Sequence, residues 1–152
     1  MTDSPLEYTF DSINVGMNHE FEITVTEKLV LDFSVISGDF NPLHINENYA
    51  TKTKFKKRIC HGMLLASFLS RLVGMYLPGK NALYFSQILN FVSPCFINDI
   101  ITVKGEIIDK NHATKIITVK TSIINKKNEL ILDGEAKVMI INNSHKNTKI
   151  EN

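Results

Sequence analysis

The first strong pattern in the chain is an alternation of apolar and polar residues over positions 20–26. Every second residue is apolar, which is typical of a strand with one buried face. The apolar spacing then lengthens to three or four residues, which predicts a helix that begins after the capping residue Thr26. Gly38 is predicted to end this helix, because glycine tolerates a left-handed backbone. The residues expected to face the core from this helix are Leu29, Phe33 and Ile36.

The next long apolar segment, residues 62–77, is apolar on nearly every side. This pattern is typical of a helix that is buried on several faces. Two serines and Arg71 interrupt it, so it is too short and too polar to span a bilayer. Before it, Pro42 is expected to prevent an early restart of helix, and a short helix is expected over 46–53.

After residue 79 the chain becomes rich in β-branched and aromatic residues, broken at 93–94, 110–113 and 125–128. This pattern predicts four antiparallel strands in sequence, a meander, over 82–92, 100–109, 114–124 and 130–141. A sheet wrapped around the apolar helix would bury both, so the predicted fold class is α+β. A second copy is expected to cover what remains exposed, which predicts a homodimer.

Length and composition limit the function classes without choosing one. The 152 residues suit one domain, predicted over 1–141, and the polar segment 142–152 is predicted to be a disordered tail. A net charge of +1 gives no reason to expect a nucleic acid or a membrane as partner. The two cysteines lie far apart, which favours reduced thiols and a cytoplasmic location, and the N-terminal residues do not resemble a signal peptide.

The stretch SGDFNPLH at 37–44 is the first candidate for chemistry. It places Asp39 and His44 five residues apart, on a segment that Pro42 stiffens. Two titratable groups held in a fixed relation can share proton transfer. On spacing alone, an alternative remains open, in which Asp39 and Asn41 only form a turn and His44 has no chemical role.

The second candidate is the pair His61-Gly62, where the apolar helix is predicted to begin. The N–H groups of a helix N-terminus have no partner within the helix and carry partial positive charge. The Gly62 N–H could therefore polarise a carbonyl, and a glycine permits close approach. The alternative is a plain helix start with a loop histidine. Asp39, His44 and His61 are too few to indicate a zinc site, so no metal is expected.

Together these motifs resemble the MaoC-like (R)-specific enoyl-CoA hydratases, which have the hot-dog fold. The resemblance rests on Phe33, on SGDFNPLH followed by Ala50, and on HGML at 61–64. It continues through LPGK at 77–80 and into the predicted strands, and covers residues from about 15 to 140.

The resemblance implies that the fold is a single hot-dog domain, with its antiparallel sheet wrapped around a long central helix. It also implies the reversible addition of water to trans-2-enoyl-CoA, giving (R)-3-hydroxyacyl-CoA, without a cofactor. Asp39 and His44 match the catalytic pair, the Gly62 N–H would polarise the thioester carbonyl, and Ser70 matches a position in the acyl pocket. The substrate would be an acyl-CoA thioester, in fatty-acid metabolism or the supply of polyhydroxyalkanoate precursors.

Two alternatives use the same scaffold differently. One is a dehydratase or thioesterase acting on an acyl-carrier-protein or another biosynthetic thioester, and the other is a non-catalytic subunit that binds acyl thioesters. The segment 51–58 carries five basic residues, which are either a solvated face or contacts for the phosphates of coenzyme A: Lys52, Lys54, Lys56, Lys57 and Arg58.

Overall fold

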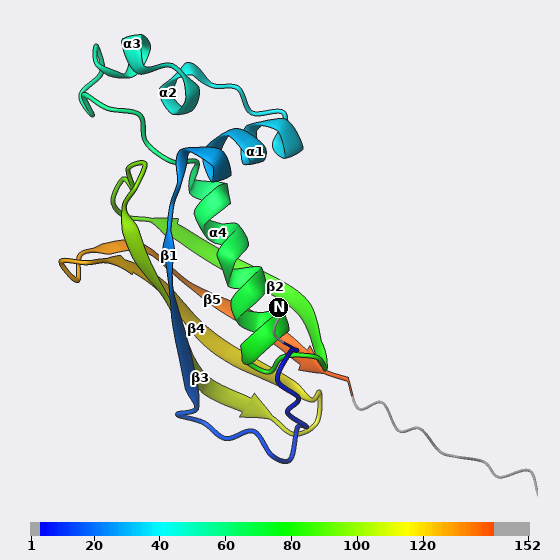
Figure 1. Ribbon diagram of the computed structural model, residues 1–152. Helices are drawn as coiled ribbons and strands as arrows, with labels where there is room; N and C mark the ends of the chain where they lie inside the picture. The colour runs from blue at the N-terminus through cyan, green and yellow to red at the C-terminus, as the bar shows by residue number, and fades with distance from the viewer. Residues whose placement is uncertain (1–3, 142–152) are drawn as a thin grey trace, which may run out of the picture.

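The computed structural model describes residues 4–141 of the chain, so the tail predicted over 142–152 lies outside the described residues. A five-stranded antiparallel sheet carries one central helix, and three further helices lie beyond one end of the sheet (Figure 1). The strands are β1 (Asn18–Thr24), β2 (Ala82–Phe91), β3 (Ile100–Asn111), β4 (Ile116–Asn125) and β5 (Leu130–Ile140). The helices are α1 (Glu27–Ser37), α2 (Pro42–Ile45), α3 (Glu47–Ala50) and α4 (Gly62–Arg71), which continues as a π-helical turn over Leu72–Tyr76.

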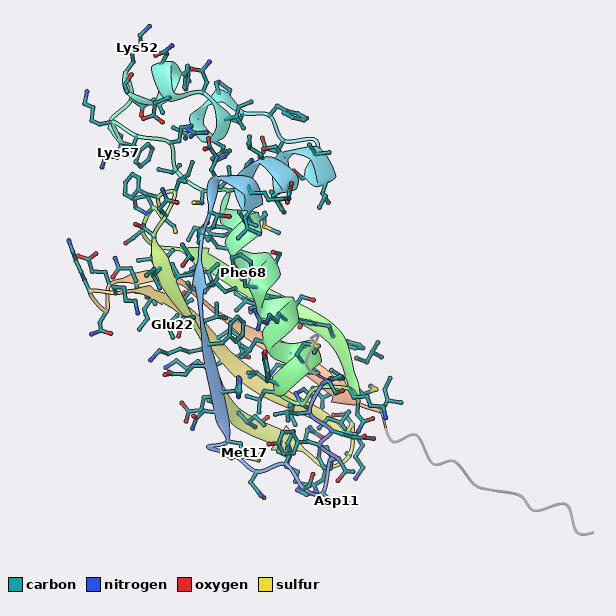
Figure 2. The ribbon with its side chains drawn as sticks, in the orientation of Figure 1. Asp11, Met17, Glu22, Lys52, Lys57 and Phe68 are labelled. Atoms are coloured by element: carbon teal, nitrogen blue, oxygen red, sulfur yellow. The ribbon has the colours of Figure 1, made fainter. Side chains whose placement is uncertain are left out.

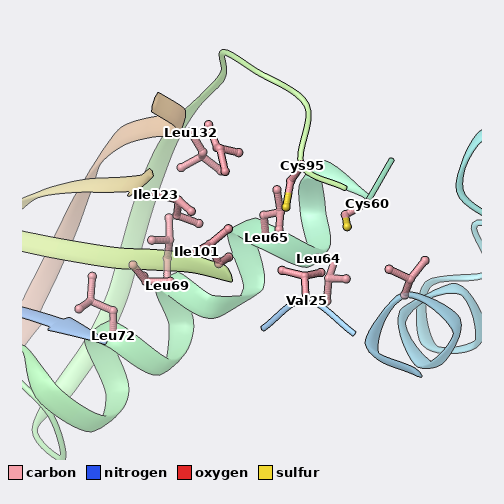
Figure 3. Packing of buried hydrophobic residues seen from close by; sticks show 13 residues of the cluster. Val25, Cys60, Leu64, Leu65, Leu69, Leu72, Cys95, Ile101, Ile123 and Leu132 are labelled. Carbon is pink, nitrogen blue, oxygen red and sulfur yellow. The ribbon is translucent and has the colours of Figure 1, made fainter. Parts of the chain in front are cut away.

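The sheet curves around α4, and the core lies between them (Figure 1). Residues of α4 such as Leu65 and Leu69 pack against inward-facing residues of β3 and β4, such as Ile101 and Ile123 (Figure 3). A second buried cluster surrounds Phe10 and Leu77 at the other end of the helix. This is the predicted hot-dog arrangement in a single α+β domain. None of the helices within residues 4–141 is long and apolar enough to cross a membrane.

The strand order corrects one prediction. The order across the sheet is β1-β3-β4-β5-β2, so only β3, β4 and β5 form a meander. β2 does not pair with β3, as the predicted meander required, but lies beside β5 at the far edge. The connection of residues 92–99 explains the difference, because it leads the chain across to the opposite side of the sheet before β3 begins, and β1 pairs with β3 there.

Two predictions about the first helices were also wrong. Ile36, expected to face the core, is 83% exposed, whereas Val30 and Ser34 are the buried positions of α1. Pro42 does not delay the helix but begins α2, since a proline at the first helical position loses no hydrogen bond. The predicted caps Thr26 and Gly38 are confirmed, the latter with φ of 75°.

The short helices determine where the candidate residues lie. The segment of α1, α2 and α3 is placed over the N-terminal end of α4 (Figure 1). An isolated antiparallel bridge between Ile59 and Phe96 then leads the chain into α4. The fold thereby brings SGDFNPLH at 37–44 close to the start of the buried helix.

Candidate active site

Asp39 lies in the tight turn that joins α1 to α2. Its Oδ1 accepts a hydrogen bond from the Asn41 N–H (3.1 Å), and its own N–H donates to Ser37 Oγ (3.2 Å). One carboxylate oxygen is thus held by the backbone, while the other, Oδ2, lies 3.9 Å from His61 Nε2. The side chain is half exposed, so water can reach the carboxylate.

His44 is carried by α2, which Asn41 caps by accepting a hydrogen bond from the Leu43 N–H (3.0 Å). His44 Nδ1 lies 2.8 Å from the Ile59 carbonyl oxygen, which can only accept. Nδ1 therefore carries the proton in the neutral ring. The lone pair of Nε2 is left free, which is the state that a proton acceptor or a ligand requires.

His61 is buried between these two residues, with 2% of its surface exposed. Its Nε2 lies 3.1 Å from the Asp39 carbonyl oxygen, and its ring contacts that of His44, with centroids 3.9 Å apart and the planes tilted by 34°. Burial lowers the pKa of His61 below its ordinary value of 6.5, and the nearby His44 lowers it further. Sequence reasoning missed this placement, because the only signals were its position beside Gly62 and the apolar residues that follow.

Gly62 begins α4, and His61 provides no side-chain cap for the helix. The first N–H groups of α4 therefore have no partner within the helix. A Cβ added at Gly62 would lie 2.7 Å from the ring of Phe91, closer than carbon atoms approach. Glycine therefore leaves room for the Phe91 ring against the helix start, and a larger residue would require that ring to shift.

A pocket of about 490 Å³ opens at this helix start. Most of its lining is apolar, while His44, Gly62 and Lys54 bring polar groups to it. Its apolar wall includes Phe55, Met63, Leu65, Phe91, Val92 and Ile131. Asp39 does not line the pocket itself but lies beside His44 at its edge, because their donor atoms are within 4.8 Å of each other.

Ser70 is separate from this group. It is exposed on α4, two turns after Gly62, and does not line the pocket of the single chain. Its predicted contact with an acyl chain stays a prediction.

Three possible metal ligands meet in the site. Asp39, His44 and His61 can each offer one atom, and these atoms lie within 4.8 Å of one another. Three protein ligands are the number found in catalytic zinc sites, so the ligand count does not by itself exclude a metal, contrary to the argument made from the sequence. Two of the ring nitrogens, however, are engaged by carbonyl oxygens, at Ile59 and Asp39, so hydrogen bonds already account for the orientation of both rings.

Comparison with known proteins identifies the class that this fold and site define. The family model described as "MaoC like domain" matches residues 10–129, and the chain belongs to this family.

Particular relatives narrow the class. The chain is 36% identical to an (R)-specific enoyl-CoA hydratase of Rhodospirillum rubrum, over 91% of this chain and 95% of the relative. It is 35% identical to a mitochondrial 3-hydroxyacyl-[acyl-carrier-protein] dehydratase of Arabidopsis thaliana, over 72% of this chain and 67% of that protein. The solved structure of an (R)-hydratase from A. caviae involved in PHA biosynthesis superposes with a TM-score of 0.83 at 37% identity, covering 86% of this chain and 98% of that one.

Two histidines with lowered pKa values predict how stability depends on pH. The pKa of His61 is lowered by burial, and that of His19 by burial and by Arg71. In the unfolded chain both histidines bind protons with the ordinary pKa of 6.5. Their contribution to the free energy of unfolding should therefore be greatest above pH 6.5, and it should decrease as the pH falls toward the lowered pKa values of the folded state. Thermal melts between about pH 7.5 and 5.5 should show this decline. In His61→Met the decline should be shallower, and an unchanged slope would contradict the assignment to His61.

Proposed function

We propose that this protein is an (R)-specific enoyl-CoA hydratase, which adds water reversibly to trans-2-enoyl-CoA and gives (R)-3-hydroxyacyl-CoA. The observation that carries the proposal is the meeting of Asp39, His44 and the Gly62 helix start, at an apolar pocket, in a chain 36% identical to a named hydratase. The reaction class is that of a hydro-lyase. We place it in fatty-acid metabolism, as a supplier of (R)-3-hydroxyacyl-CoA for polyhydroxyalkanoate synthesis.

In the proposed mechanism, Asp39 and His44 hold one water molecule between Oδ2 and Nε2. As the water oxygen bonds to C3 of the enoyl group, the pair accepts the proton that the water loses. A proton then passes from the pair to C2, so both residues regain their starting states. The Gly62 N–H donates to the thioester oxygen, where enolate-like charge develops, and such a donor is typically worth about 10²- to 10³-fold in rate.

The decisive experiment follows the absorbance of the conjugated enoyl group of crotonyl-CoA with purified protein, alongside an assay for free thiol. We expect the absorbance to fall without release of coenzyme A, and the product to be the (R) enantiomer by chiral chromatography. Release of thiol would instead indicate a thioesterase. Binding of crotonyl-CoA with no turnover would indicate a non-catalytic subunit.

The carrier of the acyl group is the main alternative, since one relative is named as a dehydratase of acyl-carrier-protein substrates. Arg58 is committed to two glutamates, with Nη2 2.6 Å from Glu27 and Nε 3.1 Å from Glu47. Lys52 and Lys57 extend outward at the far end of the molecule (Figure 2). Lys54 lines the pocket, and is therefore the basic residue that we propose for the coenzyme A phosphates.

Replacing Lys54 by Glu should raise KM for crotonyl-CoA about tenfold, because an exposed ion pair is lost and a repulsion gained, each worth up to about 1 kcal/mol. KM for crotonyl-N-acetylcysteamine, which has no phosphate, should not change. Initial rates with both thioesters test this, and Lys80→Glu, on a lysine outside the pocket, is the matched control. An equal effect on both substrates would remove Lys54 from phosphate binding.

We also propose that a second copy of the chain covers strand β2. This strand forms one edge of the sheet and exposes Phe85, Ile88 and Phe91 by 65%, 63% and 54%. A long apolar edge strand normally pairs or is covered. The opposite edge, β1, instead carries the exposed acids Glu20 and Glu22, paired with lysines of the loop and strand beside it. The contrast supports a dimer through β2, next to the pocket that Phe91 lines.

A charge on this edge should disrupt the dimer. We expect wild-type protein to elute as a dimer in size-exclusion chromatography with light scattering, and Ile88→Lys to shift toward monomer. Ile108→Lys places the same charge at an exposed position of the interior strand β3 and should leave the dimer intact. A dimeric Ile88→Lys variant would place the interface elsewhere.

A further inference from the structure

We propose that His61 is a positioning residue. Its Nε2–H holds the turn that contains Asp39, and its ring supports the ring of His44, so that Asp39 and His44 keep a fixed relative position for the reaction. This rests on the proposed hydratase function and adds a residue for which neither the motif nor the comparisons assign a role.

The first observation is the hydrogen bond to Asp39. The Asp39 carbonyl oxygen can only accept, so His61 Nε2, 3.1 Å away, is the protonated nitrogen. The Ser34 hydroxyl also lies near His61 Nε2, at 3.5 Å. It donates its proton to the Val30 carbonyl oxygen (3.0 Å), so it does not donate to Nε2. The bond joins the start of α4 to the turn after α1, which are 22 residues apart in sequence.

The second observation is that the His61 ring contacts two other rings, both tilted relative to it. His61 lies between His44, at 3.9 Å between centroids, and Phe33, at 5.1 Å. His44 is itself fixed on its other side by the Ile59 carbonyl. Movement of His61 would therefore displace the carbonyl of one proposed catalytic residue and the ring of the other.

The third observation is that His61 Nδ1 is buried and has no hydrogen-bond partner among residues 4–141. A buried N–H without a partner is costly, so this favours the tautomer with the proton on Nε2. The groups that face the ring are His44 from α2, Asp39 from the turn, and Ser34 and Phe33 from α1. Burial lowers the pKa of His61, and a positive charge on His44, when that ring holds a proton, would lower it further, so both favour a neutral His61.

The test compares two substitutions of equal length. His61→Gln retains an N–H near the Nε2 position, whereas His61→Met has the same chain length and no donor. Because misplacing a reacting group by about 1 Å costs about 10²-fold, His61→Met should lower kcat for crotonyl-CoA about 100-fold with little change in KM. His61→Gln should recover kcat to within about tenfold of wild type.

The matched control is His19→Met, which removes a histidine stacked on Tyr76 outside the site and should leave kcat unchanged. Wild-type kcat in His61→Met would overturn the proposal. Equal losses in folded His61→Gln and His61→Met would also overturn it, because the donor would then have no effect. Absence of hydration in wild type would instead refute the hydratase function, independently of His61.

A measurement on wild-type protein tests the donor directly and does not depend on whether either variant folds. Nitrogen-15 NMR of the imidazole rings should show His61 neutral near pH 7, with its proton on Nε2. A proton on Nδ1, or a cationic ring, would overturn the assignment of Nε2–H as the group that holds Asp39.

Discussion

Asp39→Asn should lower kcat for crotonyl-CoA hydration by about 10²- to 10⁴-fold, the range of a lost general acid–base group. The substitution removes the ability to accept a proton and changes little else. Oδ1 of the new amide can still accept the hydrogen bond from the Asn41 N–H, so the turn should keep its shape. KM and the melting temperature should therefore stay close to those of wild type.

Asp32→Asn is the matched control, since it makes the same chemical change on an exposed carboxylate of α1 that pairs with Lys28. It should cost no activity, because exposed ion pairs contribute at most about 1 kcal/mol to stability and Asp32 does not belong to the cluster of Asp39, His44 and His61. Full activity in Asp39→Asn would exclude Asp39 from the proposed chemistry.

Local patterns predicted most of the fold. The four β-rich segments and the apolar helix lie within a few residues of their predicted bounds, because residue composition and the polar or proline-containing breaks between segments mark them locally. The caps Thr26 and Gly38 were predictable because each acts locally, Thr26 through its hydroxyl, which accepts from the Leu29 N–H, and Gly38 through its left-handed backbone.

The order of the strands could not be read in the same way. The β-branched and aromatic residues of 82–91 indicate a strand but not which strand lies beside it. Pairing with β5 depends on the course of residues 92–99 and on the space that β1 occupies next to β3. Ile36 was misjudged because the helix buries Val30 and Ser34, a narrower and rotated face than the apolar spacing indicated.

The candidate site likewise contains residues that the sequence predicted and residues that only the folded structure places there. Asp39 and His44 share one short stretch, so their spacing and the intervening proline made them candidates from sequence. His61 is brought to them by a contact across 22 residues, and only the folded chain reveals it. Arg58 was grouped with the lysines by composition, but its two glutamate partners come from α1 and α3.

His44→Asn should likewise lower kcat by about 10²- to 10⁴-fold. The side-chain nitrogen of asparagine falls near the position of Nδ1, so it can continue to donate to the Ile59 carbonyl, as His44 does at 2.8 Å. What the variant lacks is the free lone pair of Nε2. The loss should therefore appear in kcat, measured by the fall in enoyl absorbance, while the protein melts at nearly the same temperature as wild type.

The double variant Asp39→Asn/His44→Asn distinguishes a shared water from two separate roles. If both groups hold one water, removing either abolishes the same step, and the double variant should be little worse than the slower single variant, as residues that act as a unit are non-additive. Multiplication of the two losses would instead mean that Asp39 and His44 act in independent steps. In that case the separation of 4.8 Å or less between the possible ligand atoms of Asp39 and His44 would not reflect a common water.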